Sequence, residues 1–204
     1  MRLEAGRACF DQLSDDLEAS RAAERQSRRE ALVDTLTGQA NRRQIELWLG
    51  DALADAEARV GRMALLFLDL DAFKTVNDAQ GHAVGDAALC RVAGILRDTV
   101  PPGWRVARIA GDEFLALATD LDAADAATTS VARALLAAIA QPLVLVPGLV
   151  MPLSISIGGA VYDSAMIDRS EWLRRADSAM YAAKASGDNQ FRMYRNHPEA
   201  AAAS

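Results

Sequence analysis

The sequence predicts an α+β fold, with a mixed β-sheet and helices packed over it. Three observations support this class. Short apolar runs typical of buried strands alternate with amphipathic helical stretches, one segment has the strand–turn–strand pattern of a β-hairpin, and no internal repeat is present. With 204 residues, of which 51% are hydrophobic and 25% charged, the chain suits one folded domain with an appendage.

Residues 1–33 are predicted to form an N-terminal helix that precedes the domain. Leu3, Phe10 and Leu17 are spaced seven residues apart and Leu13 takes the matching d position, which is the pattern of a coiled coil for about two heptads. Polar residues occupy the core positions that follow, so the pattern ends there. A dimerising stalk and a solvated helix that only leads into the domain are both compatible with it.

The first elements of the domain, which spans residues 34–195, follow from a helix cap, an apolar run and a helical period. Asn41 can cap a helix that extends to about residue 59. The continuous apolar run 63–70 predicts a central strand covered on both faces. Residues 84–100 repeat apolar side chains at helical spacing and end at two prolines, which predicts a second helix.

The remaining elements continue this alternation. They are, in order, the hairpin strands 104–109 and 114–118, helix 122–140, strands 143–146 and 153–162 on either side of a Pro-Gly turn, helix 170–185 and a final strand 191–194. Residues 196–204 are alanine-rich and lack any strand or cap signal, so they are predicted to be a disordered tail.

Charge and cysteine content disfavour several classes of protein. A formal net charge of −6 disfavours a nucleic acid polymer as partner. Cys9 and Cys90 have neither metal-ligand nor disulfide spacing, which favours a reducing compartment. We see no signal-peptide pattern and no apolar run close to the ~18 residues of a membrane span. The sequence therefore predicts a soluble, cytoplasmic protein.

Acidic residues stand at the end of the predicted central strand and in the hairpin turn. Asp69 and Asp71 point to the same side of their strand, because side chains alternate along it. If this strand and the hairpin are neighbours, Asp69, Asp112 and Glu113 converge at one edge of the sheet. Carboxylates that close repel one another, and a divalent cation such as Mg²⁺ would relieve the repulsion. Taken singly, each acidic stretch is also compatible with an ordinary polar turn.

The segment between these acidic positions offers side chains suited to a nucleotide. Asn77 and Asp86 supply a carboxamide and a carboxylate of the kind that read a guanine edge, the acid accepting from N1–H and N2–H. Lys74 can meet a phosphate as a point charge. Gly81 and Gly85 indicate a turn before the next helix, and we interpret His82 as a packed or capping residue. Together with the acids, these side chains indicate a guanine nucleotide beside a metal site.

Five stretches of the sequence, in this order, resemble the GGDEF family of diguanylate cyclases. They are Asp34–Arg43, Asp69–Asp86, Arg108–Phe114, Ser154–Gly158 and Ala176–Asn189. The resemblance extends over nearly all of the chain after the N-terminal helix. It implies a palm-like sheet and an enzyme that condenses two GTP into cyclic di-GMP with release of two pyrophosphates. Because each such domain holds one GTP, it also implies a homodimer.

The resemblance implies roles for individual residues. The catalytic and metal-binding set, which would hold two Mg²⁺ (or Mn²⁺) ions, is Asp69, the Leu70 carbonyl, Asp112 and Glu113, with Glu113 assisting deprotonation of the ribose 3′-hydroxyl. The implied GTP-binding set is Asn77 and Asp86 at the guanine, the backbone amides of Ala72 and Phe73 with Lys74 and Lys184 at the phosphates, and Gly111 where the backbone passes close to the nucleotide.

Three positions depart from the family pattern. Ala110 replaces the first glycine of the signature turn and adds one methyl group. Asp188 stands where the family carries an arginine on the triphosphate. This reversal exchanges an attraction for a repulsion, each on the order of 3 to 4 kcal/mol at ~4 to 5 Å and an effective dielectric of 20, unless Arg175 or Arg192 compensates. The window 101–104 lacks the RxxD motif of the family's inhibitory site, so we expect no product inhibition there.

Three functional hypotheses remain open at this point. The first is an Mg²⁺-dependent diguanylate cyclase that acts as a homodimer and is slowed by Asp188. The second is a catalytically weak or inactive GTP-binding module that dimerises or regulates a protein partner. A structural remnant that binds nothing is the third, and the intact acidic set argues against it.

Overall fold

The computed structural model describes residue 21 and residues 31–54, 60, 62–163 and 168–195. The helices are α2 (Arg42–Ala54), α3 (Phe73–Gln80), α4 (His82–Thr99), α5 (Ala124–Ile139) and α6 (Arg169–Ala185). The strands are β1 (Ala64–Leu70), β2 (Trp104–Ala110), β3 (Glu113–Ala118), β4 (Leu143–Val146), β5 (Leu149–Met151), β6 (Ile155–Val161) and β7 (Phe191–Met193).

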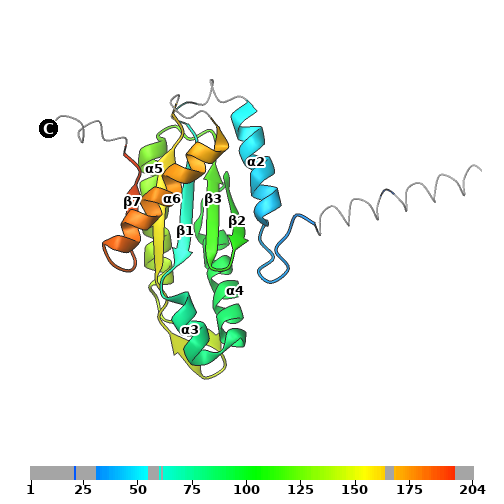
Figure 1. Ribbon diagram of the computed structural model, residues 1–204, viewed down its shortest axis with the longest axis vertical. Helices are drawn as coiled ribbons and strands as arrows, with labels where there is room; N and C mark the ends of the chain where they lie inside the picture. Colours follow the sequence, from blue (N-terminus) through cyan, green and yellow to red (C-terminus); the bar gives the residue numbers. More distant parts are fainter. Residues whose placement is uncertain (1–20, 22–30, 55–59, 61, 164–167, 196–204) are drawn as a thin grey trace, which may run out of the picture.

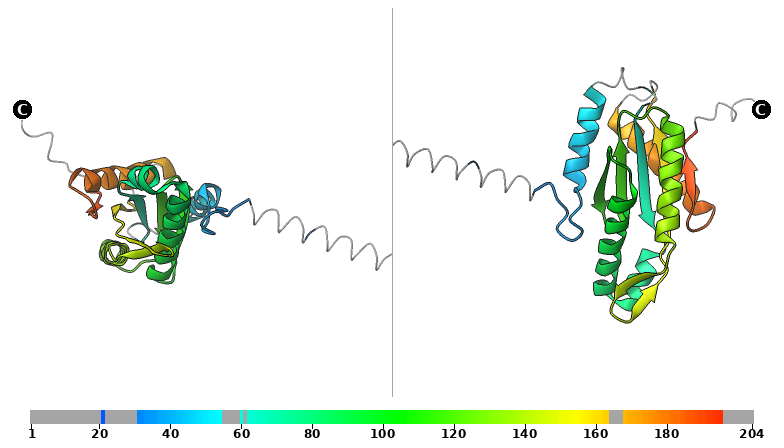
Figure 2. Two further views of the ribbon diagram at one scale, coloured as in Figure 1. Left: turned by 90° about the horizontal axis from the view of Figure 1, so that it is seen from below. Right: turned by 180° about the vertical axis from the view of Figure 1, so that it is seen from behind.

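The architecture is a five-stranded mixed sheet between two layers of helices. The strand order is β2-β3-β1-β6-β7, with β6 and β7 parallel and the other neighbours antiparallel. Helices α2 and α6 lie on one face of the sheet (Figure 1). Helices α4 and α5 lie on the other face, seen from behind in Figure 2. The predicted α+β class with a helix-covered mixed sheet is therefore confirmed.

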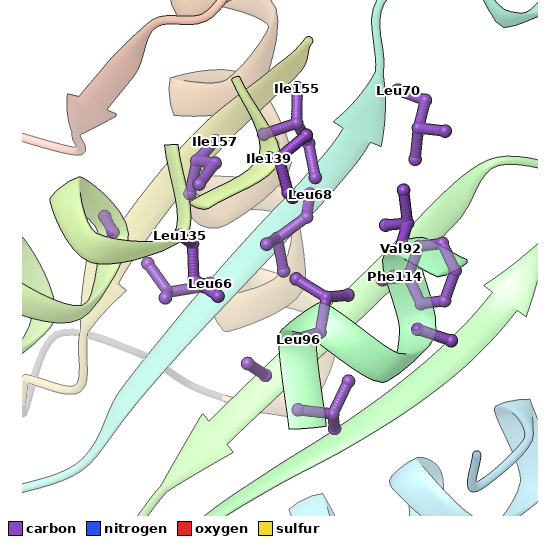
Figure 3. Close-up of a cluster of buried hydrophobic side chains, with 14 of the residues drawn as sticks. Leu66, Leu68, Leu70, Val92, Leu96, Phe114, Leu135, Ile139, Ile155 and Ile157 are labelled. Carbon is purple, nitrogen blue, oxygen red and sulfur yellow. The ribbon is translucent and has the colours of Figure 1, made fainter. Parts of the chain in front are cut away.

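Strand β1 lies in the centre of the sheet, and every one of its residues is buried. Alternate side chains enter two separate cores. Leu66 and Leu68 pack toward α4 and α5, in the cluster drawn in Figure 3, while Leu65 and Phe67 pack toward α2 and α6. Two apolar faces explain why this strand appears in the sequence as a continuous apolar run instead of an alternating one. The prediction of a central strand covered on both faces is confirmed.

Two elements differ from the sequence-based expectation. Residues 73–80, for which the sequence predicted no helix, form helix α3, and Phe73 and Val76, three residues apart, both pack against the core. Strand β4 pairs with β5, which the sequence did not predict, in a separate two-stranded sheet across the Pro-Gly turn. Pro152 has no N–H to donate, so the chain leaves that hairpin before β6 joins the main sheet.

Several predictions concern the ends of elements or of the chain. Helix α2 ends at Ala54 in the described residues, and residues 55–59 lie outside them. Apart from residues 21 and 31–33, the predicted N-terminal helix also lies outside the described residues, as does the predicted tail 196–204. Within the part that is described, no helix combines the length and apolarity needed to cross a membrane.

Candidate active site

The acidic residues meet where β1 ends and β3 begins. Asp69 lies directly opposite Glu113 in the antiparallel pairing of the two strands. The Leu70 N–H donates to the Asp112 carbonyl at 3.3 Å, so the hairpin turn is joined to the end of β1. Residues directly opposite in such a pair have neighbouring side chains on one face. The structure therefore brings Asp69, Asp112 and Glu113 to one edge of the sheet.

The environment of Asp69 and Glu113 disfavours the negative charge of their side chains. Burial is the main cause that raises the pKa of Asp69 above its ordinary value, and the nearby charge of Asp112 adds to it, while Lys184 acts in the opposite direction. Burial also raises the pKa of Glu113, with further contributions from Asp69 and Asp112. Partly buried carboxylates that repel one another in this way favour a cation between them.

The donor set fits a hard cation that is completed by a substrate. Among the described residues, no three His, Cys, Asp or Glu side chains stand close enough to form a metal cage by themselves. Mg²⁺ is commonly held by one or two carboxylates together with substrate phosphates and waters. Asp69 and Glu113 offer carboxylate oxygens from opposite strands, with Asp112 and the Leu70 carbonyl beside them. The arrangement suits that mode of binding better than an all-protein site.

Lys184 contacts the acidic edge directly. It lies in the last turn of α6, and its ammonium group forms an ion pair and a hydrogen bond with the Asp69 carboxylate. The sequence resemblance placed this residue at the phosphates. In the structure, its partner is Asp69, the acid opposite Glu113.

Asp71 is a structural residue. One of its oxygens accepts a hydrogen bond from the Ser156 hydroxyl at 2.6 Å, and the other accepts from the Asn189 backbone N–H at 2.9 Å. Asp71, Ser156 and Asp69 are all buried. The Asp71 carboxylate therefore ties the segment after α6 to the start of β6. The metal-ligand set that the resemblance implies does not include Asp71 and stays a prediction.

The hairpin turn is held by an arginine that sequence reasoning did not assign. The Arg108 guanidinium donates twice to the Gly111 carbonyl, from Nε at 2.9 Å and Nη2 at 2.7 Å, and once to Asp34, from Nη1 at 3.0 Å. Asp34 also accepts from the backbone and hydroxyl of Thr37. Gly111 has φ +44°, a conformation that glycine adopts without strain. Ala110, beside it, is exposed, so its extra methyl group meets no crowding.

The hydrogen bonds of this network favour the charged form of Asp34. Burial alone would raise its pKa, but the hydrogen bonds from Thr37 and Arg108 outweigh burial and hold the pKa below its ordinary value. A lowered pKa means that the folded chain favours the ionised form of Asp34. The ion pair with Arg108 is thus a stabilising connection between the start of the domain and the signature turn.

The predicted guanine-binding residues lie on two adjoining helices. Asn77 is on α3, and Asp86 is exposed in the first turns of α4. A Cβ atom at Gly85 would lie 1.9 Å from the Asn77 Oδ1, so the Asn77 side chain rests directly against α4, one residue before Asp86. Gly85 is therefore a helix residue that makes room for Asn77, and not the turn residue that the sequence indicated.

The predicted phosphate-binding amides lie at the start of α3. Ala72 has φ +52°, which is left-handed, and Phe73 begins the helix immediately after the buried end of β1. The first N–H groups of a helix lack intrahelical acceptors and attract anions. Lys74 is exposed in the same turn. Ala72, Phe73 and Lys74 therefore offer donors next to Asp69, on the segment that connects the acidic edge to Asn77.

Replacing Gly85 by alanine is expected to weaken nucleotide binding with little effect on folding. The new methyl group displaces the Asn77 amide, whereas alanine itself suits a helix better than glycine. Loss of one or two hydrogen bonds to the base corresponds to about a tenfold weaker Kd. Calorimetry with a non-hydrolysable GTP analogue measures it.

Gly94→Ala, in the same helix, is the matched control for Gly85→Ala. The nearest atom to its new Cβ would be 3.9 Å away, on Arg97. Equal GTP affinity for the two variants would show that Asn77 does not contact the base.

Asp188 lies in the turn that follows α6. It is exposed, and the next residue, Asn189, is the one whose backbone N–H binds Asp71. Of the two arginines considered as replacements for the missing positive charge, Arg175 is not available. It is buried, donates to Glu171 and Asp163 at 2.7 Å each, and stacks over Tyr194. Arg192 is exposed in β7.

A groove of about 430 Å³ adjoins Glu113 between α2 and α6. Its lining combines apolar side chains, among them Ile45, Phe67 and Leu173, with the charged Arg42 and Asp177. Asp177 contributes to the raised pKa of Glu113 and Arg42 opposes it, both as lesser influences than burial. Glu113 is therefore accessible to a group that approaches from outside the domain along this face.

Comparison with known proteins points to one family. The family model described as "Diguanylate cyclase, GGDEF domain" matches residues 31–190. The chain is 42% identical over 161 residues to the bifunctional diguanylate cyclase/cyclic di-GMP phosphodiesterase MucR of Pseudomonas aeruginosa, a match that covers 79% of this chain and 23% of MucR. It is 36% identical over 179 residues to the diguanylate cyclase TpbB of the same species, covering 86% of this chain and 41% of TpbB. The chain thus spans less than half the length of these relatives.

Solved structures show the same similarity in three dimensions. The GGDEF domain of TpbB from Pseudomonas aeruginosa has a TM-score of 0.74 at 35% identity, covering 79% of this chain and 99% of that one. The coiled coil and GGDEF domain of DgcB from Caulobacter crescentus, solved in complex with c-di-GMP, has a TM-score of 0.80 at 27% identity, covering 92% and 98% of the two chains.

Proposed function

Because this chain belongs to the GGDEF family of diguanylate cyclases, we propose that it condenses two molecules of GTP into cyclic di-GMP, with release of two pyrophosphates, as an Mg²⁺-dependent homodimer. The observation that carries the proposal is the pairing of Asp69 with Glu113 across β1 and β3, directly followed in the chain by the start of α3. The acidic oxygens, the helix amides and the Asn77 side chain then follow one another along the chain, from the end of β1 into α3.

Each part of the nucleotide has candidate partners in this part of the domain. Asn77 and Asp86 would bind the guanine edge, and the amides of Ala72 and Phe73, with Lys74, would bind phosphate oxygens. Asp69 and Glu113, assisted by Asp112 and the Leu70 carbonyl, would hold the metal ions. Bound Mg²⁺ supplies charge neutralisation at the triphosphate and makes the ribose 3′-hydroxyl easier to ionise. Mn²⁺ would serve the same purpose.

Glu113 is the residue that we propose to accept the proton of the attacking hydroxyl. Burial, and then Asp69 and Asp112, raise its pKa, which brings a carboxylate closer to the pKa range suited to proton transfer. The α2–α6 groove gives access to Glu113 from outside, as a reaction between nucleotides on two facing domains requires. A homodimer, with the N-terminal helix as its stalk, would supply that second domain.

The decisive experiment is product analysis. The purified chain, confirmed as a dimer by light scattering, is incubated with GTP and Mg²⁺, and the nucleotides are separated by chromatography. Cyclic di-GMP and pyrophosphate are expected in a ratio of one to two. A dimer that binds GTP but yields no cyclic di-GMP would instead support the second candidate, a GTP-binding module that regulates a protein partner. The exposed Asp188, with Arg175 held in ion pairs, favours that candidate.

Replacing Asp188 by arginine is expected to raise kcat/KM for GTP by about 10- to 100-fold. The change removes a negative charge near the triphosphate and adds a positive one, and solvent screening at this exposed position reduces the full Coulomb difference. Asp188→Asn should give an intermediate increase. Asp98→Arg changes the net charge equally on the distant end of α4 and serves as control. Equal activity of Asp188→Arg and wild type would contradict the electrostatic explanation.

We also propose that the cyclase lacks inhibition by its product at the usual position. The window 101–104 comprises the turn between α4 and β2 and the first residue of β2, and it contains neither an arginine nor an acid. Initial rates with added cyclic di-GMP should stay within about twofold of the uninhibited rate until the product competes with GTP at the active site. Strong inhibition that disappears when residues 101–103 are replaced would contradict this expectation.

A further inference from the structure

The contact between Lys184 and Asp69 joins two parts of the proposed site that are 115 residues apart in the chain. The side chain of Asp69 is 12% exposed and that of Lys184 is 35% exposed. Asp69 lies among other acids and is the partner of Glu113 in the strand pairing. Within the described residues, Lys184 is the basic side chain that contacts this carboxylate, and it neutralises the most buried acid of the edge.

The backbone of Lys184 is fixed on both sides. Helix α6 packs so closely on β6 that a Cβ at Gly158 would lie 2.1 Å from the backbone of both Ala176 and Met180. After the helix, the Asn189 N–H is bound to Asp71. The remaining freedom is in the lysine side chain, whose flexible four-carbon stem carries a compact charge. Lys184 can therefore exchange partners while α6 stays in place.

A metal ion and an ammonium group cannot share the same carboxylate without repulsion. Both would approach the oxygens of Asp69 at contact distance, where two positive charges repel strongly in a partly buried site. Each therefore excludes the other from Asp69. Phosphates of an arriving nucleotide offer Lys184 an alternative anionic partner, and the carboxylate is then free for the metal ion.

From these contacts we infer that Lys184 is an intramolecular competitor of the divalent cation for Asp69. In the domain without nucleotide, Lys184 occupies the carboxylate and weakens metal binding. When nucleotide binds, Lys184 transfers to the phosphates and the metal takes its place, so one side chain couples the two ligands. This inference rests on the proposed metal site, but it assigns Lys184 a role that phosphate binding alone does not include.

The test is metal binding in the absence of nucleotide. Mn²⁺ is titrated into the full chain, and free Mn²⁺ is followed by its electron paramagnetic resonance signal. Lys184→Met removes the competing charge and keeps an unbranched apolar stem, so its Mn²⁺ affinity should exceed that of wild type by about tenfold, within the usual range of coupling between sites. Lys184→Arg, which keeps the charge, should resemble wild type. Asp69→Asn should abolish the gain when combined with Lys184→Met.

A second measurement protects the test from a folding artefact. Lys184→Met leaves Asp69 without its counter-ion, so Mn²⁺ should raise the Tm of this variant more than that of wild type. Lys184→Gln, which can still donate a hydrogen bond to Asp69, is the replacement if Lys184→Met does not fold. If the uncharged variant binds Mn²⁺ no more tightly than wild type, the inference is wrong.

The outcomes separate this inference from the proposed function. If wild type forms cyclic di-GMP and Lys184→Met binds Mn²⁺ no more tightly than wild type, the proposed cyclase activity is supported and the proposed competition is wrong. If Lys184→Met binds Mn²⁺ more tightly and wild type forms no cyclic di-GMP, the competition is supported and the proposed cyclase activity is wrong.

Discussion

Asp69→Asn is expected to lower the rate of cyclic di-GMP formation by on the order of a thousandfold, because a metal ligand that neutralises transition-state charge contributes several kcal/mol. Asn keeps the shape of Asp69 but carries no charge for a cation. Stability should change little, since the substitution also removes one of the carboxylates that repel one another at this edge. Initial rates by chromatography and Tm by calorimetry measure the two effects. If Asp69→Asn retains more than a tenth of the wild-type rate, Asp69 is not a catalytic metal ligand.

Asp71→Asn is the matched control, because it makes the same chemical change two residues away. Asp71 accepts from Ser156 and from the Asn189 N–H, and a neutral amide has one acceptor oxygen in place of two. We expect a loss of about 1 to 2 kcal/mol in the free energy of unfolding, since hydrogen bonds to charged groups are the stronger ones. Mn²⁺ binding should persist. If Mn²⁺ binding falls equally in both variants, Asp69 and Asp71 form one metal site.

Asp69 and Asp71 lie two residues apart but have different hydrogen-bond partners, and this difference shows how far sequence reasoning reached at this site. Strand alternation placed Asp69 and Asp71 on one side, and the apolar run 63–70 located the strand, because both depend only on local pattern. The partners that separate the two roles come from far along the chain, Ser156 from β6 and Lys184 from α6. No local pattern encodes such a contact. The sequence therefore identified the two acids but could not show that they have different partners.

The same limit explains the errors in the fold. Gly81 and Gly85 both indicated a turn, and the structure agrees only for Gly81, whose φ is +86°. Gly85 is helical, and the reason for a glycine there is the Asn77 side chain against it. A glycine that is needed for backbone conformation and one that is needed for space look identical in a sequence. The start of α4, which lies at His82, was predicted two residues too late for this reason.

Gly158 is a glycine that is needed for space and not for backbone conformation. It lies in the middle of β6, opposite Phe67 of β1, and has no need of an unusual φ. A Cβ at this position would lie 2.1 Å from the Ala176 carbonyl oxygen and 2.1 Å from the Met180 nitrogen. Both atoms belong to the backbone of α6, so no side-chain rotation relieves the overlap. The helix as a whole has to move away from the sheet.

Gly158→Ala is therefore expected to destabilise the domain by about 3 kcal/mol or more, which for a chain of this size lowers Tm by roughly 6 to 12 °C. Gly94→Ala, a change of the same size with no close contact, should leave Tm unchanged or slightly raised. Moving α6 also moves Lys184 away from Asp69. The Gly158 variant should thus lose the ion pair along with its stability, and a Tm equal to that of Gly94→Ala would show that α6 does not pack on β6 at this distance.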